Sequence, residues 1–118
     1  AGLAPDTRVG LIRDKTGTLN ISIASVPYPV LAAVWLVYFD PKHKTRARRG
    51  ENRGRTIFNY NVVRAIKRIG EWRGRELVLK VPGKDIKSQK TNGGAVIIQA
   101  EQKGPILGAQ RISFAPTN

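Results

Sequence analysis

Residues 30–39 read Val-Leu-Ala-Ala-Val-Trp-Leu-Val-Tyr-Phe, which is the longest apolar run in the chain. Ten residues are too few to cross a membrane, since a spanning helix needs roughly 18 or more apolar residues in a row. The run is also too apolar for a strand that exposes one face to water. Pro27 and Pro29 precede it, and Asp40-Pro41 follows it. The pattern predicts a central β-strand that ends at Asp40 and places Trp35 in the core.

Shorter segments on both sides of this run also have strand patterns. Residues 9–12 and 19–23 predict a hairpin, because apolar and polar residues alternate in the second segment and turn-forming residues lie between the two. Residues 77–81 predict another strand, and residues 95–100 with 106–114 predict a closing pair. Residues 82–94 are predicted to be a polar connection. The sequence therefore predicts an all-β fold, an antiparallel β-sandwich of about seven strands in a single domain spanning residues 1–118.

Residues 56–72 fit two different structures. Phe58, Val62 and Ile69 lie on one stripe of a helix that Gly70 could cap. The many β-branched and aromatic residues, and the β character of every neighbouring segment, favour a long, bent strand. The pattern alone leaves this choice open. Trp72, at the end of the segment, is predicted to lie in the core.

Composition narrows the classes of protein that fit. The chain has 118 residues, 41% of them apolar, which is enough for one domain with a core of its own. The absence of cysteine excludes disulfides, cysteine-ligated metals and thiol chemistry. Methionine is absent as well, so we expect a processed or excised fragment of a longer protein. His43 is the single histidine and has no carboxylate cluster nearby, so no metal site and no cofactor are predicted.

Positive charge is concentrated in one part of the chain. The formal net charge is +13, and residues 42–75 hold twelve Lys and Arg against Glu51 and Glu71, a net +10. Such a field attracts polyanions such as nucleic acid, lipopolysaccharide or acidic polysaccharide, although a solvated basic face fits the pattern too. The alternation of cations from Lys44 to Arg48 predicts a basic strand face before a turn at residues 50–54. The candidate anion-binding residues are Lys42, Lys44, Arg46, Arg48, Arg49, Arg53, Arg55, Lys67 and Arg68.

One short motif suggests catalysis. Residues 14–19, Asp-Lys-Thr-Gly-Thr-Leu, resemble the phosphorylation loop of P-type ion-pumping ATPases, in which the aspartate accepts the phosphoryl group. That chemistry needs a parallel strand before the aspartate, a helix after it and further carboxylates for magnesium. An alternating strand follows here instead, so the motif is predicted to be a turn. No nucleophile, base and orienting group can be assembled from one histidine and eight dispersed acids, and we expect a protein that is not an enzyme.

Five segments carry a family resemblance. They are Ala33-Val-Trp-Leu-Val-Tyr38, Arg49-Gly-Glu-Asn-Arg-Gly-Arg-Thr56, Tyr60-Asn-Val-Val-Arg64, Gly70-Glu-Trp72 and Gly104-Pro-Ile-Leu-Gly-Ala109. Together they resemble the C-terminal part of a bacterial exported family called domain of unknown function 1223. The resemblance implies a periplasmic or secreted protein in which a thioredoxin-like domain with a Cys-x-x-Cys motif precedes a β-rich domain. This cysteine-free chain would be the second domain alone, without redox activity.

Two functional hypotheses follow. The first is a structural or interaction domain that packs against a thioredoxin-like domain or protein partner, and that could form a homodimer through the apolar surface left uncovered. The second is a polyanion-binding protein that acts through the basic residues named above. The predicted interface network of the first hypothesis consists of Arg49, Glu51, Asn52, Arg53 and Arg64.

Overall fold

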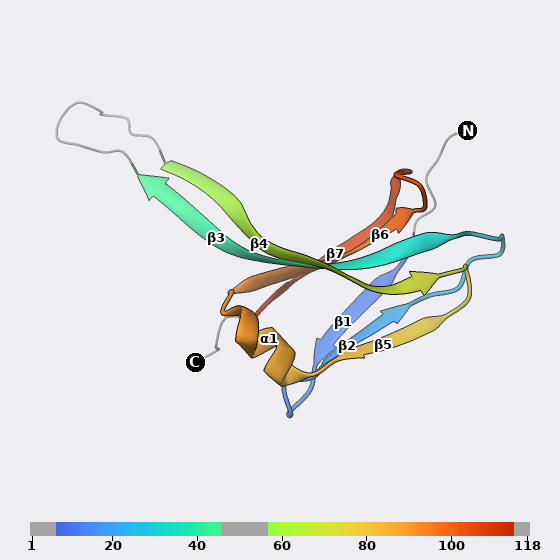
Figure 1. The fold of residues 1–118 in the computed structure, drawn as a ribbon, viewed down its shortest axis with the longest axis horizontal. Helices are drawn as coiled ribbons and strands as arrows, with labels where there is room; N and C mark the ends of the chain where they lie inside the picture. The colour runs from blue at the N-terminus through green and yellow to red at the C-terminus, as the bar shows by residue number, and fades with distance from the viewer. Residues whose placement is uncertain (1–6, 46–56, 115–118) are drawn as a thin grey trace.

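The computed structural model describes residues 7–45 and 57–114, which form two antiparallel sheets and a short helix. One sheet has the strand order β1-β2-β5 and the other β4-β3-β6-β7. Figure 1 shows the long β3 and β4 crossing above the three-stranded sheet. The prediction of an antiparallel β-sandwich of about seven strands is confirmed. The elements are β1 (Val9–Arg13), β2 (Leu19–Ile23), β3 (Ala32–Thr45), β4 (Ile57–Trp72), β5 (Leu77–Val81), α1 (Gly83–Gln89), β6 (Gly93–Ala100) and β7 (Ile106–Ser113).

The core lies between the two sheets and is built from alternate residues of their strands. From β2, Leu19, Ile21 and Ile23 have no exposed surface. From the other sheet, Leu36 and Tyr38 of β3 are about equally inaccessible, at 1% exposure each. Burying a large apolar side chain contributes roughly 1.5 to 3 kcal/mol, so this alternation, which repeats in several strands, determines which face of each strand turns inward.

β3 is the central strand that the apolar run predicts, because it pairs with β4 on one side and β6 on the other. The predicted end at Asp40 is wrong, since β3 continues to Thr45. Pairing with β6 stops at Phe39, and beyond it β4 is the partner. There β3 is an edge strand, where a proline such as Pro41 is tolerated because its missing N–H need not serve a second neighbour.

The ambiguous segment forms a strand, β4, and it is bent as expected. Two shifts in the register with β3 leave Arg64 and Ile69 as extra residues without a directly opposed partner. Such bulges bend a strand and increase its twist. Pairing with β3 therefore decides a choice that the apolar pattern of residues 56–72 left open.

The connection predicted at residues 82–94 contains a helix that the sequence analysis did not predict. α1 follows Pro82 and is capped at its C-terminal end by Lys90, whose φ of 54° is left-handed. Ile86 is its buried apolar side chain, with 2% exposure, and it belongs to the core cluster. One apolar residue in seven gives no helical periodicity, which explains why the sequence pattern did not reveal it. Among the described residues, no helix has the length and apolar character needed to cross a membrane.

Candidate interaction surface

The four-stranded sheet has a second face, which points away from the three-stranded sheet and which we call the outer face. Residues of β3 alternate between the two faces, so the neighbours of inward-facing Leu36 and Tyr38 point outward. These outward residues are Trp35, Val37 and Phe39. The outer face of the central strand is therefore as apolar as its inner face.

Residues on the neighbouring strands extend this apolar surface. Ile66 of β4 and Ala95 of β6 both pair with Val37, and Ile97 of β6 pairs with Trp35. Ile66 is 59% exposed, and Val63, which pairs with Phe39, is 54% exposed. Most soluble monomers expose apolar side chains singly, whereas these lie side by side across three strands, with Phe39, only 6% exposed, covered by Arg111. The apolar residues of the outer face are Trp35, Val37, Phe39, Val63, Ile66, Ala95, Ile97, Ile106 and Ala109.

The solvent-facing side of the three-stranded sheet is a useful comparison. Asn20 and Lys80 pair directly on that side, and Ser22 pairs with Val78. Val78 is 56% exposed, close to the value for Ile66, but its neighbours along β2 are polar. Ile12 is also exposed on this side, at 67%, but it pairs with Asn20, so Ile12 and Val78 are apolar residues among polar neighbours. The two solvent-facing sides of the sandwich thus differ in how their apolar residues are distributed.

Charged residues border the outer face. Arg68 donates to Glu101 over 2.6 Å, and this hydrogen bond raises the pKa of Arg68. The guanidinium of Arg111 lies 5.2 Å from the ring centre of Phe39, a cation–π distance. An apolar centre within a charged border is the usual arrangement of a protein–protein interface.

The two tryptophans occupy different environments. Trp72 is fully buried and its indole N–H donates to the carbonyl oxygen of Arg75 over 2.8 Å, so its predicted core position is confirmed. Trp35 is half-buried on the outer face, and the prediction that it lies in the core is wrong. Its indole nitrogen is inaccessible to solvent and has no hydrogen-bond partner among the described residues. The sequence could not show which face Trp35 occupies, because both faces of the central strand are apolar.

The structure separates several of the predicted site residues. Arg64 forms an ion pair with Asp40, with 3.1 Å between Arg64 Nε and Asp40 Oδ2. Lys67 pairs with inward-facing Leu36, whereas Arg68 pairs with outward-facing Trp35, so the two adjacent cations lie on opposite faces of β4. The structure therefore does not bring Lys67 and Arg68 together. The predicted residues Arg46, Arg48, Arg49, Glu51, Asn52, Arg53 and Arg55 lie outside the described residues.

Lys42 and Lys44 belong to a part of β3 that extends beyond the sandwich. Residues 40–45 pair with residues 57–62 only, and Figure 1 shows this two-stranded ribbon, which we call the arm, projecting away from both sheets. The arm continues toward the segment that carries most of the predicted anion-binding residues.

The aspartate of the ATPase-like motif is occupied within its own loop. Asp14 Oδ1 accepts hydrogen bonds from the backbone N–H of Thr16 at 2.9 Å and of Thr18 at 3.2 Å, and from the Thr16 hydroxyl. Its other oxygen accepts from the Asn20 amide at 3.2 Å. These bonds, the Thr16 hydroxyl first, lower the pKa of Asp14 from 3.8 to about 2. The turn prediction is confirmed, with the glycine of the motif at a φ of 85°.

Metal-ligating residues do not gather elsewhere in the described part of the chain. No group of three or more His, Asp or Glu side chains there has a geometry suited to a metal ion. The outer face is the surface that reasoning from the sequence missed. Val63 and Ile66 could have revealed it, since both are apolar residues of an expected strand, but their facing partners become known only with the register.

Comparisons with known proteins place the chain in a family. The model of the family described as "Protein of unknown function (DUF1223)" matches residues 1–99. The chain belongs to this family. No curated protein matches the chain.

A solved structure has the same fold. It is the X-ray crystal structure of a protein from Agrobacterium tumefaciens, similar with a TM-score of 0.71 and 20% sequence identity. The match covers 96% of this DUF1223 chain and 48% of that protein. The chain thus spans about half the length of this relative, and the likeness extends to the fold.

Proposed function

We propose that this DUF1223 chain is a non-catalytic interaction domain of an exported bacterial protein, and that its outer face packs against a thioredoxin-like domain. The observation that carries the proposal is the apolar outer face. Ile66, Val63 and Ile106 are each more than half exposed there, at 59%, 54% and 55%. Each would bury further apolar area against a partner, at roughly 25 cal/mol for every Å² removed from water.

Two further observations support a domain partner. The chain covers 48% of its solved relative, so that protein contains about as much chain again outside the match. The family resemblance implies that a thioredoxin-like domain precedes the β-rich domain. A domain covalently linked to this one would meet the outer face at high effective concentration, which favours packing even through a modest interface.

The decisive experiment supplies the partner separately. The thioredoxin-like domain of a longer family member is titrated with the chain by isothermal calorimetry, and the chain carries either Ile66→Glu or Val78→Glu. The two positions are matched, since both are β-branched strand residues with 59% and 56% exposure, but they lie on different sheets.

The proposal expects binding that Ile66→Glu abolishes and Val78→Glu leaves intact, because a charge buried in an apolar contact carries a large desolvation cost. Equal effects of the two variants, or no binding at all, would overturn it. Analytical ultracentrifugation of the chain alone tests whether a second copy of the chain, instead of a thioredoxin-like domain, covers the outer face. Dimerisation that Ile66→Glu abolishes would assign the outer face to self-association instead.

Polyanion binding is the second candidate, and the arm favours it. The arm projects from the sandwich and leads into residues 46–56, which hold five arginines against Glu51, a net +4 of the +10 of residues 42–75. A projecting basic ribbon can reach a polyanion without contact by the rest of the domain. Arg64 and Arg68 are already ion-paired, which makes them poor candidates for contact with a polyanion.

Binding to duplex DNA and to heparin at about 50 and 200 mM salt tests this candidate, because phosphate-type contacts weaken by orders of magnitude over that range. The test variant replaces Arg46, Arg48, Arg53 and Arg55 with Ala. The control replaces four cations elsewhere, Lys80, Lys84, Lys87 and Lys90. Equal losses of affinity in both variants would mean that the polyanion responds to the net charge of the protein alone, and would reject a specific binding site at the arm.

A further inference from the structure

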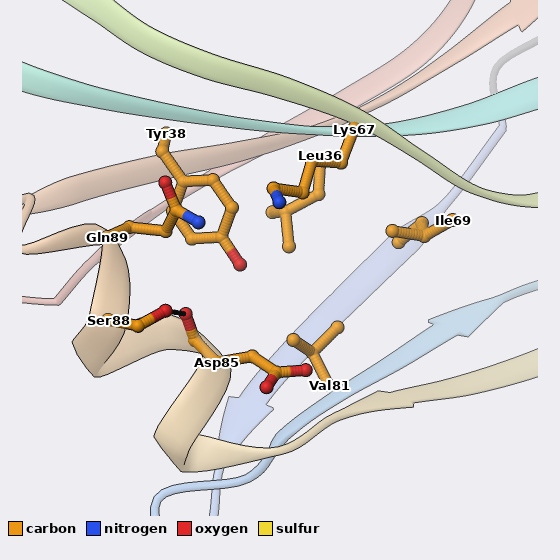
Figure 2. Close-up of a pocket in the computed structure, with 8 residues that line it drawn as sticks. All are labelled: Leu36, Tyr38, Lys67, Ile69, Val81, Asp85, Ser88 and Gln89. Atoms are coloured by element: carbon orange, nitrogen blue, oxygen red, sulfur yellow. Dashed lines mark hydrogen bonds between the residues drawn. The ribbon is translucent and has the colours of Figure 1, made fainter.

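A cavity of about 270 Å³ lies between α1 and the inner face of the four-stranded sheet. Figure 2 shows the side chains around it, with β3 and β4 on one side and the helix on the other. Leu36, Ile69 and Val81 form its apolar wall. The cavity exceeds by far the roughly 15 Å³ that a single water requires, and it approaches the size of small-molecule sites, which begin at about 300 Å³.

The hydroxyl of a tyrosine points into this cavity. Tyr38 is 1% exposed, and in Figure 2 its hydroxyl lies between the sheet and the helix. It has no hydrogen-bond partner among the described residues. Burial, and secondarily the carboxylate of Asp85, raise the pKa of Tyr38, so the hydroxyl keeps its proton at neutral pH. A protonated phenol in the cavity wall is a donor that an acceptor atom of a ligand could use.

Opposite charges stand on the two sides of the cavity. Lys67 approaches from β4, and Asp85 approaches from α1. Neither forms an ion pair within the described part of the chain, although three other pairs do. The cavity therefore offers a cation and a phenol donor toward the sheet and an anion toward the helix. Gln89 adds an amide that can donate or accept.

We propose that this cavity binds a small zwitterion of the α-amino acid class. Its carboxylate would accept hydrogen bonds from Lys67 and the Tyr38 hydroxyl, and its ammonium group would donate to Asp85. An aliphatic side chain would lie against Leu36, Ile69 and Val81. Charge-assisted hydrogen bonds are the stronger kind, and a ligand with both charges satisfies all three groups at once. The site lies on the face of the sheet opposite the outer face, so it is independent of the proposed interaction surface.

The probe is L-leucine, titrated into the ¹⁵N-labelled chain and followed by NMR. Two analogues serve as comparisons: N-acetyl-L-leucine lacks the ammonium group, and L-leucinamide lacks the carboxylate. We expect saturable shifts at residues around the cavity, and binding of each analogue at least about tenfold weaker, as the loss of a charged hydrogen bond predicts. Equal binding of all three compounds, or no saturable shift with leucine, would overturn the proposal.

Variants then locate the site. Tyr38→Phe removes only the hydroxyl oxygen, and Asp85→Asn keeps the shape of the side chain while removing its charge. Lys84→Gln is the control, because Lys84 is an exposed residue of the same helix that does not line the cavity. The proposal expects at least about tenfold weaker leucine binding in the first two variants and none of that loss in the control. Unfolding midpoints confirm that each variant is folded. Unchanged binding in folded Tyr38→Phe and Asp85→Asn would reject the site.

Discussion

The carboxylate of Asp40 receives Arg64 Nε at 3.1 Å on one oxygen and the backbone N–H of Asn92 at 3.1 Å on the other. Arg64 is an extra residue in a bulge of β4, and Asn92 immediately precedes β6. One side chain thus connects both neighbours of the central strand at the point where the arm leaves the sandwich.

Replacing the two members of this pair should have unequal effects. Asp40 is 15% exposed in its side chain and Arg64 is 49% exposed. Asp40→Ala removes the acceptor of both bonds at once and should cost about 1 to 2 kcal/mol. Arg64→Ala removes a half-exposed ion pair worth about 1 kcal/mol or less. Urea unfolding of both variants measures the difference, and similar costs would contradict the connecting role of Asp40.

The stability of the domain should depend on pH through Asp14. Its pKa is lowered to about 2 in the folded chain from 3.8, so the folded state favours the carboxylate. The stabilisation is fully present above pH 3.8 and is lost as the pH falls toward 2. Asp14→Asn should flatten the decline of stability between these values. A carboxyl titration by NMR with a midpoint near 3.8 would contradict the loop hydrogen bonds.

The absence of a side chain at Gly93 leaves room for the ring of Phe39 on the outer face. A Cβ built there would lie 2.5 Å from Cε1 of Phe39, which is closer than two carbons can approach. Gly93→Ala should therefore destabilise the domain by about 1 to 3 kcal/mol, as overpacking does. The substitution Phe39→Leu should lower the free energy of unfolding by less in the Gly93→Ala variant than in the wild type. Additive costs in this double-mutant cycle would mean that the ring is not the obstacle.

Ile86 holds α1 against the core. It is the buried apolar side chain of the helix, with 2% exposure, so Ile86→Ala should cost about 2 to 5 kcal/mol. Lys84→Ala, at an exposed site on the same helix, should change stability by less than about 0.5 kcal/mol. Thermal unfolding compares the two. A small effect of Ile86→Ala would mean that the helix adds little to the domain, and the cavity beside it would be a weak site.

The two tryptophans should report different surroundings. In Trp35→Phe the remaining Trp72 is fully buried, so its fluorescence emission should be blue-shifted and resistant to quenching by acrylamide. In Trp72→Phe the remaining Trp35 is half-buried on the outer face, so acrylamide should quench it more strongly. Binding of a partner to the outer face should then protect Trp35. Equal quenching of the two single-tryptophan variants would contradict the separate environments.

The alternation of residues along β2 and β5 determined the class of fold, because a period of two places the apolar side chains on one face. The hairpin at Asp14 was equally local, since Asp, Thr and Gly form that turn with hydrogen bonds inside a few residues. The apolar run around Trp35 was enough to predict a central strand. These features rest on interactions close in sequence, which is why the sequence alone revealed them.

The remaining features depend on which strands meet. Residues 56–72 had helical and strand patterns at once, and only pairing with β3 selected the strand. Trp35 and Leu36 are adjacent and apolar, yet one faces the outer surface and the other the core, because register and the position of the second sheet assign the faces. The cavity likewise needs Tyr38, Lys67 and Asp85 from three separate elements. Tertiary packing alone brings such residues together, since no local preference links them.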